Sequence, residues 1–210
     1  TLVAAAFGCS ALMANAQSGL FVEGGIGIGA ATTKFVTSEP GFRETIDIGK
    51  SRPLGSLGAG WRWTSPTTVF GVGAFGNLAG RNIGEITVTD PAGSVTGKLE
   101  QRNHWGIGVE AGWRLAPPTT IYGKLTWNRA NFKGTLTETL PPDVFTDSIS
   151  NNHSGPGFGV GLRHALAANS YVFAEWRHVN FNRKTRVIEG VSYTVDPSNS
   201  IGLVGLGWTF

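Results

Sequence analysis

Hydrophobic and polar residues alternate along the last stretch of the chain, residues 199–210. Every second position from Gly202 to Phe210 lies on one face, which carries Gly, Val, Leu, Trp and Phe, while Gly205, Gly207 and Thr209 lie on the other. A period of two is typical of a β-strand, because successive side chains point to opposite sides of the backbone. We therefore expect a closing strand whose apolar face contacts lipid and whose edge pairs with the first strand.

The same alternation recurs in seven earlier stretches, at residues 20–30, 54–63, 68–79, 103–115, 119–130, 155–166 and 170–181. It is clearest at 103–115, where Trp105, Ile107 and Val109 share one face and His104 and Glu110 share the other. In each stretch apolar side chains occupy one face, and the other carries mostly Gly and polar residues, together with aromatic residues such as Phe21, Tyr122 and Tyr171. The pattern predicts eight strands with the apolar face outward.

Connections of two lengths alternate between these strands. The short turns are at 64–67, 116–118 and 167–169, and the long loops are at 31–53, 80–102, 131–154 and 182–198. Ala-Gly-Trp-Arg at 59–62 recurs at 111–114, each time before a Pro-Thr-Thr turn, which indicates a meander of hairpins. Short turns on one side and long loops on the other are typical of an outer-membrane barrel with its long loops outside the cell.

The long loops carry turn residues near their midpoints, at 39–41, 90–93, 140–143 and 189–190. β-prone residues flank these points, as in Ile86-Thr87-Val88-Thr89. We therefore expect hairpins that continue the barrel strands beyond the bilayer.

Composition narrows the class of protein. Of the 210 residues, 40 % are hydrophobic and only 15 % are charged, and no stretch after residue 16 approaches the roughly 18 apolar residues of a membrane helix. Such a chain is either a tight soluble all-β domain or a membrane β-barrel, and the outward apolar faces favour the barrel. The net charge of +3 is too small and too dispersed to indicate nucleic acid as a partner.

Aromatic residues support a membrane span. Trp105 and Trp113 lie eight residues apart on one face, or roughly 27 Å along a strand. At a tilt of about 40° this becomes about 20 Å along the membrane normal, close to an apolar band of about 25 Å between two aromatic girdles. The residues that we assign to the girdles are Trp61, Trp63, Trp105, Trp113, Trp127, Trp176, Trp208 and Phe210.

The first residues resemble a secretory signal peptide. Residues 1–16 are apolar and rich in Ala, and they end in Ala14-Asn15-Ala16, a small-residue cleavage site. The basic start of such a peptide is missing, so we expect a signal peptide truncated at its start, followed by a barrel domain over 17–210. A lipoprotein site at Cys9, the single cysteine, is the weaker alternative.

Together, the eight-strand meander, the hairpin that leads into Tyr171-Val172-Phe173-Ala174-Glu175-Trp176-Arg177 and the ending Gly205-Leu206-Gly207-Trp208-Thr209-Phe210 resemble the OmpA-like and opacity-type small outer-membrane barrels of Gram-negative bacteria. The resemblance covers residues 19–210. It implies an eight-stranded antiparallel transmembrane barrel in the outer membrane, a monomer, in which the terminal aromatic strand is read by the barrel-insertion machinery. The resemblance does not extend to the peptidoglycan-binding domain of OmpA, so cell-wall tethering is not carried over to this chain.

Charged residues of both signs face inward. We expect them to form an ion-pair network in the lumen, because unpaired charges in so narrow a barrel are costly. The residues are Glu23, Arg62, Glu110, Arg114, Lys124, Arg163, Glu175 and Arg177. The expected role is a plug that fixes the barrel, and the alternative is a narrow low-conductance pore opened by breaking pairs such as Glu110–Lys124.

Catalytic chemistry finds little support in the sequence. His153-Ser154 is the best candidate for a lipid A-modifying enzyme, but neighbouring strand residues point to opposite faces, and the His-x-Ser spacing of such barrels is absent. No His, Cys and Asp cluster has metal-ligand spacing, and no helix follows the glycine run of the first strand, so we expect neither metal nor cofactor.

Basic residues gather where the seventh strand meets its loop. Arg183, Lys184 and Arg186 are candidate contacts for the phosphates of lipopolysaccharide, for which Arg and Lys are suited. We therefore expect outer-membrane lipids and lipopolysaccharide as partners, and extracellular ligands at the loops. The predicted function is a structural and surface-interaction role without catalysis.

Overall fold

The computed structural model describes residues 18–39, 41–79, 82–90, 93–116, 118–140, 143–188 and 191–210. The expected signal peptide, with Cys9, lies outside the described residues. The described chain forms ten antiparallel strands: β1 (Gly19–Glu39), β2 (Phe42–Thr64), β3 (Thr68–Ala79), β4 (Asn82–Asp90), β5 (Gly93–Ala116), β6 (Thr119–Leu140), β7 (Asp143–Ala165), β8 (Ser170–Asn180), β9 (Lys184–Ile188) and β10 (Val191–Thr209). Within these ranges no helix is long and apolar enough to cross a membrane.

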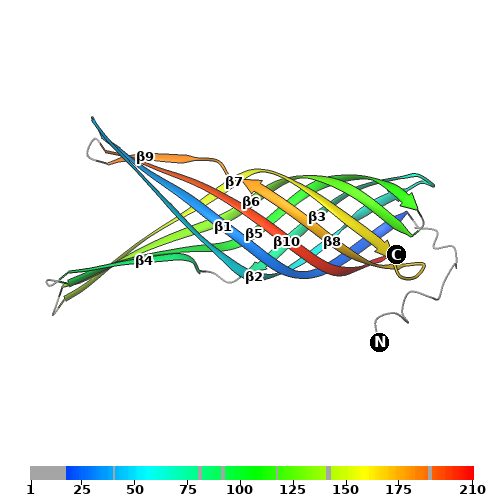
Figure 1. Ribbon diagram of the computed structural model, residues 1–210, viewed down its shortest axis with the longest axis horizontal. Helices are drawn as coiled ribbons and strands as arrows, with labels where there is room; N and C mark the ends of the chain where they lie inside the picture. Colours follow the sequence, from blue (N-terminus) through cyan, green and yellow to red (C-terminus); the bar gives the residue numbers. More distant parts are fainter. Residues whose placement is uncertain are drawn as a thin grey trace.

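Eight of the strands close into a ring. The pairing order is β1-β2-β3-β5-β6-β7-β8-β10, and β10 returns to pair with β1 from Phe21↔Thr209 to Ser38↔Ser192. The ribbon shows the tilted strands wrapping around one long axis (Figure 1). The predicted eight-stranded meander and its closure through the last strand are confirmed.

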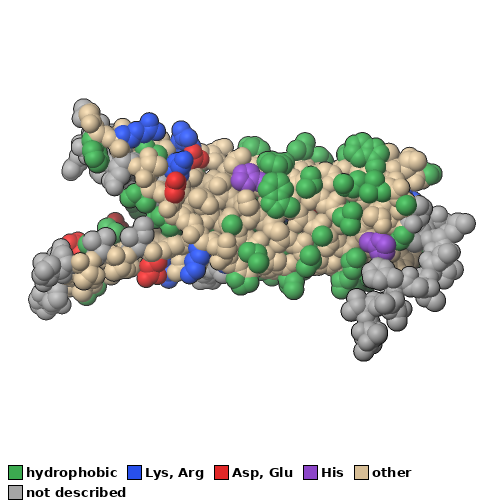
Figure 2. All heavy atoms as spheres, in the orientation of Figure 1, with side chains coloured by type: hydrophobic (Ala, Val, Ile, Leu, Met, Phe, Trp, Pro, Cys, Tyr) green, Lys and Arg blue, Asp and Glu red, His purple; other side chains and the backbone are tan. Residues whose placement is uncertain are grey.

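The two faces of each strand are also as predicted. Leu20 and Val22 on β1 are exposed, whereas Phe21 between them is buried. Large apolar side chains cover the outside of the barrel, and most charged side chains of the visible face lie at the end that carries the long loops (Figure 2). The barrel is therefore apolar outside, and its buried interior contains many charged and polar side chains, unlike the core of a soluble protein.

Most barrel strands continue well past the predicted bounds. In β1 and β2, for example, pairing extends to Glu39↔Phe42 at the tip of the first loop. The other tips fall at Asp90↔Gly93, Leu140↔Asp143 and Val191↔Ile188. The long loops are hairpins that continue the strands, as expected, and their turns lie at the predicted positions.

Two strands of the ring, β3 and β8, are short, and this splits the loop end of the barrel. Among the described residues, the outer half of β2 pairs only with β1, and the outer half of β7 pairs only with β6. The strands therefore form two separate sheets beyond the ring, β9-β10-β1-β2 and β4-β5-β6-β7. Figure 1 shows these two loop sheets diverging from the barrel.

A bulge interrupts β5 where it leaves the ring. The register with β6 shifts between Arg102 and Trp105, and Asn103 adopts a left-handed φ of 49°. Both Gln101 and His104 are consequently buried, although they lie three residues apart. A β-bulge inserts one extra residue and changes the direction of the side chains beside it, so simple alternation does not hold here.

Candidate functional site

One cluster of ion pairs crosses the lumen toward the end with the short turns. Arg62 donates to Glu110 Oε1 at 2.8 Å and to Glu23 Oε1 at 2.9 Å. Arg163 donates to Glu23 at 3.2 Å and to Glu110 Oε2 at 3.1 Å. The Tyr171 hydroxyl donates to Glu23 at 2.8 Å. Two cations and two carboxylates thus form a closed square, with its charges balanced and all four side chains buried.

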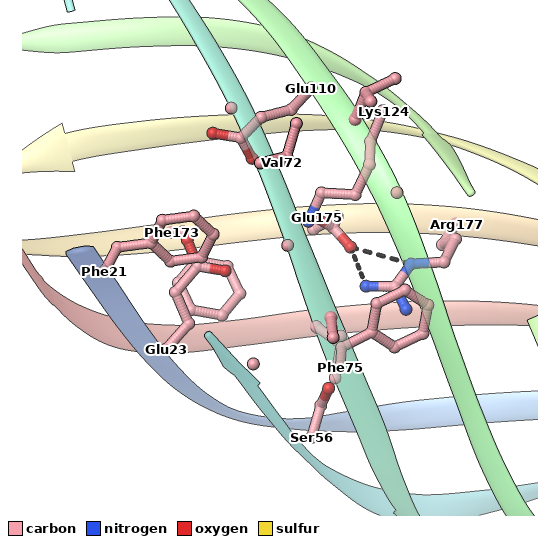
Figure 3. Close-up of a pocket in the computed structure, with 17 residues that line it drawn as sticks. Phe21, Glu23, Ser56, Val72, Phe75, Glu110, Lys124, Phe173, Glu175 and Arg177 are labelled. Atoms are coloured by element: carbon pink, nitrogen blue, oxygen red, sulfur yellow. Dashed lines mark hydrogen bonds and ion pairs between the residues drawn. The ribbon is translucent and has the colours of Figure 1, made fainter. Parts of the chain in front are cut away.

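A second cluster is centred on Glu175. Its carboxylate accepts from Lys124, from Arg177 Nε at 3.0 Å and from the Tyr122 hydroxyl at 3.0 Å. The Arg177 guanidinium lies over the Phe75 ring, 3.7 Å from its centroid. Figure 3 shows Glu175 and Arg177 facing one another, with Phe75 beside the guanidinium. In this second cluster, the Glu175 carboxylate forms ion pairs with two cations, Lys124 and Arg177.

The tertiary structure differs from the predicted pairing in two respects. Lys124 pairs with Glu175, not with Glu110, although Glu110 and Lys124 are direct cross-strand neighbours. Arg114 stays outside both clusters: it is half-buried, and among the described residues it makes no ion pair. Its position near the short turns explains this, because the carboxylates of the square lie farther along the lumen.

Two tyrosines on inward positions of β6 and β8, Tyr122 and Tyr171, connect the clusters. The Arg163 guanidinium lies 4.3 Å from the ring centroid of Tyr122 and 5.1 Å from that of Tyr171. Each phenol also donates to a carboxylate of one cluster. The sequence contains a signal for this role, because both tyrosines occupy inward-facing positions on strands that also carry inward charges.

Little free volume remains around these groups. A cavity of about 30 Å³ lies between Glu23, Phe75 and Glu175, and one of about 60 Å³ lies below the square toward the short turns. A Cβ added at Gly207 would lie 2.3 Å from the Tyr171 ring, and one at Gly161 would lie 2.3 Å from the Tyr122 ring. Inward glycines therefore make room for the two phenols.

An apolar cluster closes the loop end of the lumen. It combines side chains from β1, β4, β5, β6 and β8 and the residue after β8: Ala31, Ile83, Leu99, Ala130, Phe132, Val179 and Phe181. Phe181 packs edge-on against Phe132 and His104, with ring centroids 5.4 and 5.7 Å apart. We call this group the apolar cap. It separates the ion pairs from the space between the two loop sheets.

The residues that we assigned to the girdles are all exposed. Trp63, Trp113 and Trp208 pair with residues beside the short turns, at Phe70, Thr68 and Ser170. The remaining members at this end are Trp61 and Phe210. Trp105 pairs with Gly76 near the end of β3, Trp127 pairs with Pro156 of β7, and Trp176 lies four residues before the end of β8.

The basic rim residues are only partly described. Arg183 is exposed and donates to Asp196 Oδ2 at 2.7 Å, and Lys184 is exposed. The side chain of Arg186 lies outside the described part of the molecule. Beside the bulge of β5, Arg102 hydrogen-bonds to Glu100, and this holds the pKa of Glu100 below its ordinary value.

His153 and Ser154 do not form a catalytic pair in this geometry. His153 is buried under the Phe132 ring, and its Nδ1 lies 2.9 Å from the Asn182 carbonyl oxygen. Ser154 follows on the opposite face of β7. Across the described ranges, no group of three His, Cys, Asp or Glu side chains could hold a metal ion.

Comparisons with known proteins give a family and a fold. The family model described as outer membrane protein beta-barrel domain matches residues 1–210, and a search of curated proteins found no match. Among solved structures, the chain is similar to the outer membrane protease OmpT from Escherichia coli, at 11 % identity over 93 % of this chain and 98 % of that chain, with a TM-score of 0.57. It is also similar to the outer membrane protein OprG from Pseudomonas aeruginosa, at 12 % identity over 94 % and 98 % of the two chains, with a TM-score of 0.53. At these identities the likeness shows the fold alone.

Proposed function

The chain belongs to the outer membrane protein β-barrel domain family, and from this premise we propose that it is a non-catalytic structural barrel with a closed lumen. The expected location in the outer membrane and the expected antiparallel barrel follow from the family and the fold. A structural role, a pore and an enzyme are all compatible with that family. The choice among them rests on what fills the barrel.

The packed lumen is the observation that supports a structural role. The balanced square, the Glu175 cluster and the apolar cap fill successive levels of the interior. The cavities beside the square and the Glu175 cluster measure about 30 and 60 Å³, enough for one or a few waters each. Buried pairs of this kind tie together strands that are not neighbours in the wall, because Arg62 lies on β2 while Glu110 lies on β5.

Single-channel recording tests the closed lumen. Protein refolded into a planar bilayer is expected to give no resolvable conductance steps, since ions would have to displace paired charges and then cross the apolar cap. The variant Phe132→Ala with Phe181→Ala opens the cap but leaves the ion pairs intact, so it is also expected to remain silent. Regular steps from the wild-type protein would instead support the narrow pore.

A surface-interaction role is supported by apolar side chains on the loop sheets, beyond the lipid-facing band. Phe42 and Ile46 on β2 and Val144, Phe145 and Ile149 on β7 are all exposed. Exposed apolar groups outside a lipid-facing surface are typical of contact sites for partners. We propose that these sheets present that surface to ligands outside the cell.

Adherence measurements test this second role. Cells that display Val144→Ser with Phe145→Ser and Ile149→Ser are expected to bind host cells or matrix more weakly than cells with the wild-type protein. The matched control, Thr146→Ala with Ser148→Ala, changes exposed polar neighbours on the same strand. Equal adherence of all three, at equal surface amounts, would contradict the proposal.

The remaining proposals concern lipids and assembly. We propose that Arg183, Lys184 and Arg186 contact lipopolysaccharide phosphates, and that the last strand is read by the insertion machinery. Replacement of the three basic residues by Ala should weaken lipopolysaccharide binding, and an unchanged affinity would count against the contact.

The absence of catalysis is tested with purified protein, which should release no acyl chains from lipopolysaccharide. A release of acyl chains that His153→Ala abolishes would establish catalysis.

A further inference from the structure

The barrel wall has a notch where β3 ends. The last pair between β2 and β3 is Leu54↔Ala79, while β2 and β5 continue beyond it. A cavity of about 680 Å³ occupies this position, and its walls come from three strands. We call it the wall notch; Arg52, Gly76, Asn77, Leu78 and residues 101–105 line it.

Two buried polar groups of the wall notch lack partners. Arg52 donates to Gln101 Oε1 across the gap, but Gln101 Nε2 has no hydrogen-bond partner, although Gln101 is only 2 % exposed. Asn77 Nδ2 lies 3.0 Å from His104 Nδ1, whereas Asn77 Oδ1 has no hydrogen-bond partner. The Asn77 residue is 8 % exposed. Buried polar atoms almost always have a partner, and one left without costs about 1–3 kcal/mol. The walls of the notch therefore contain one spare donor, Gln101 Nε2, and one spare acceptor, Asn77 Oδ1, both buried.

The bulge of β5 forms the outer part of the notch. It places Asn103 outward in the left-handed conformation and turns Gln101 and His104 inward on either side. Bulges and strained backbone positions recur at binding sites, where they aim side chains. The notch lining offers mainly donors: the guanidinium groups of Arg52 and Arg102 and the amides of Gln101 and Asn103. Arg102 donates through Nε and Nη2 to Glu100, which leaves the N–H groups of its Nη1 for a ligand. A donor-rich cavity suits an anion.

The height of the notch identifies the source of that anion. Trp105 lines the notch and is half-exposed on the outside of the wall, as is Leu78. Tryptophan at the loop end of the apolar band marks the level of the lipid headgroups. The notch therefore opens sideways toward headgroups of the outer leaflet, whose lipopolysaccharide carries phosphates on its lipid A sugars.

We propose that the wall notch is a binding site for a lipid A phosphate, held by Arg52, Gln101, Arg102 and Asn103. The site rests on the placement of the barrel in the outer membrane, but not on a closed lumen or on ligands at the loop sheets. It is also distinct from the rim residues Arg183, Lys184 and Arg186. A conducting barrel could still bind lipid in this way.

An isosteric charge change provides the sharpest test. Asn103→Asp keeps the size of the side chain and tolerates the left-handed backbone, but it places a negative charge at the mouth of the notch. The control Asn152→Asp adds the same charge to an exposed residue of β7 and preserves the oxygen that accepts from Asn131. Both are folded if they retain the heat-modifiable shift of the wild-type protein on gels.

Binding of bisphosphorylated lipid A is then measured by titration calorimetry, with the full chain in detergent micelles. We expect Asn103→Asp to weaken binding at least tenfold and Asn152→Asp to change it less than twofold. A second variant, Gln101→Leu with Arg102→Gln, should also lose at least tenfold. Dephosphorylated lipid A should bind the wild-type protein at least tenfold more weakly than the phosphorylated lipid.

Three results would overturn the proposal. Affinities of Asn103→Asp and Asn152→Asp that agree within twofold would exclude the notch as the site. Equal binding of phosphorylated and dephosphorylated lipid A would exclude the phosphate as the recognised group. Inorganic phosphate that binds as tightly as lipid A would exclude the lipid as its source. Planar-bilayer conductance of the same preparation tests the closed lumen separately.

Discussion

The substitution Arg163→Met tests whether the square of ion pairs holds the barrel together. Met removes the charge but keeps a long apolar stem. Arg163 donates to Glu23 at 3.2 Å and to Glu110 at 3.1 Å, so its loss leaves Arg62 to serve two buried carboxylates. Breaking a buried pair by removing one partner costs about 3–5 kcal/mol, because an uncompensated charge remains. We expect a loss of that size in the free energy of unfolding.

Urea unfolding of protein refolded into lipid vesicles, followed by tryptophan fluorescence, measures this loss. Arg114→Met is the matched control: it removes a half-buried arginine from the same end of the lumen that makes no ion pair among the described residues. It should cost less than about 1 kcal/mol, close to the value for exposed charges. The double variant Glu110→Gln with Arg163→Met restores the charge balance, so the two changes should couple by about 1 kcal/mol or more. If Arg163→Met and Arg114→Met lowered the free energy of unfolding by equal amounts, the reasoning would be refuted. The square would then be hydrated and would not stabilise the barrel.

Two further changes test the two faces of the wall. Gly207→Ala brings a Cβ to 2.3 Å from the Tyr171 ring and should destabilise the barrel by about 1–3 kcal/mol in the same urea assay. In the control Gly202→Ala, the new Cβ meets no atom within 4 Å, so this change should be nearly neutral. Similar losses for the two variants would show that the Tyr171 phenol moves freely. On the outside, Val109 lies midway between Trp105 and Trp113. Val109→Arg should lower the free energy of unfolding by about 2–4 kcal/mol, whereas Trp113→Arg, near the interface, should lower it by about 0–1 kcal/mol. Equal costs at both depths would contradict the assigned membrane band.

Much of the fold was predictable because its determinants are local. Alternation at 103–115 places Trp105 and Glu110 on opposite faces whatever the strand pairs with, since successive side chains always diverge. Turn residues at 39–41 and 90–93 likewise locate the loop tips directly. The alternation fails at Asn103, where the bulge adds a residue, and the sequence carries no clear signal for it.

The candidate sites were less predictable. Inward charges such as Glu110, Lys124 and Glu175 were identified, but their partners were not. Contacts across a barrel depend on strand tilt and stagger, which place Glu175 of β8 within reach of Lys124 of β6. The wall notch was missed altogether, because Arg52, Asn77 and Gln101 belong to three strands and only the early end of β3 brings them around one cavity.

The sequence by itself therefore determined the number of barrel strands, the face that meets lipid and the positions of the loop tips. Each of these follows from side-chain period and turn chemistry within a few residues. Only the tertiary structure decided which charges pair, how the loop strands separate into two sheets and where the wall opens. Those features depend on distances between residues far apart in the chain, which closure of the tilted ring sets and local pattern does not.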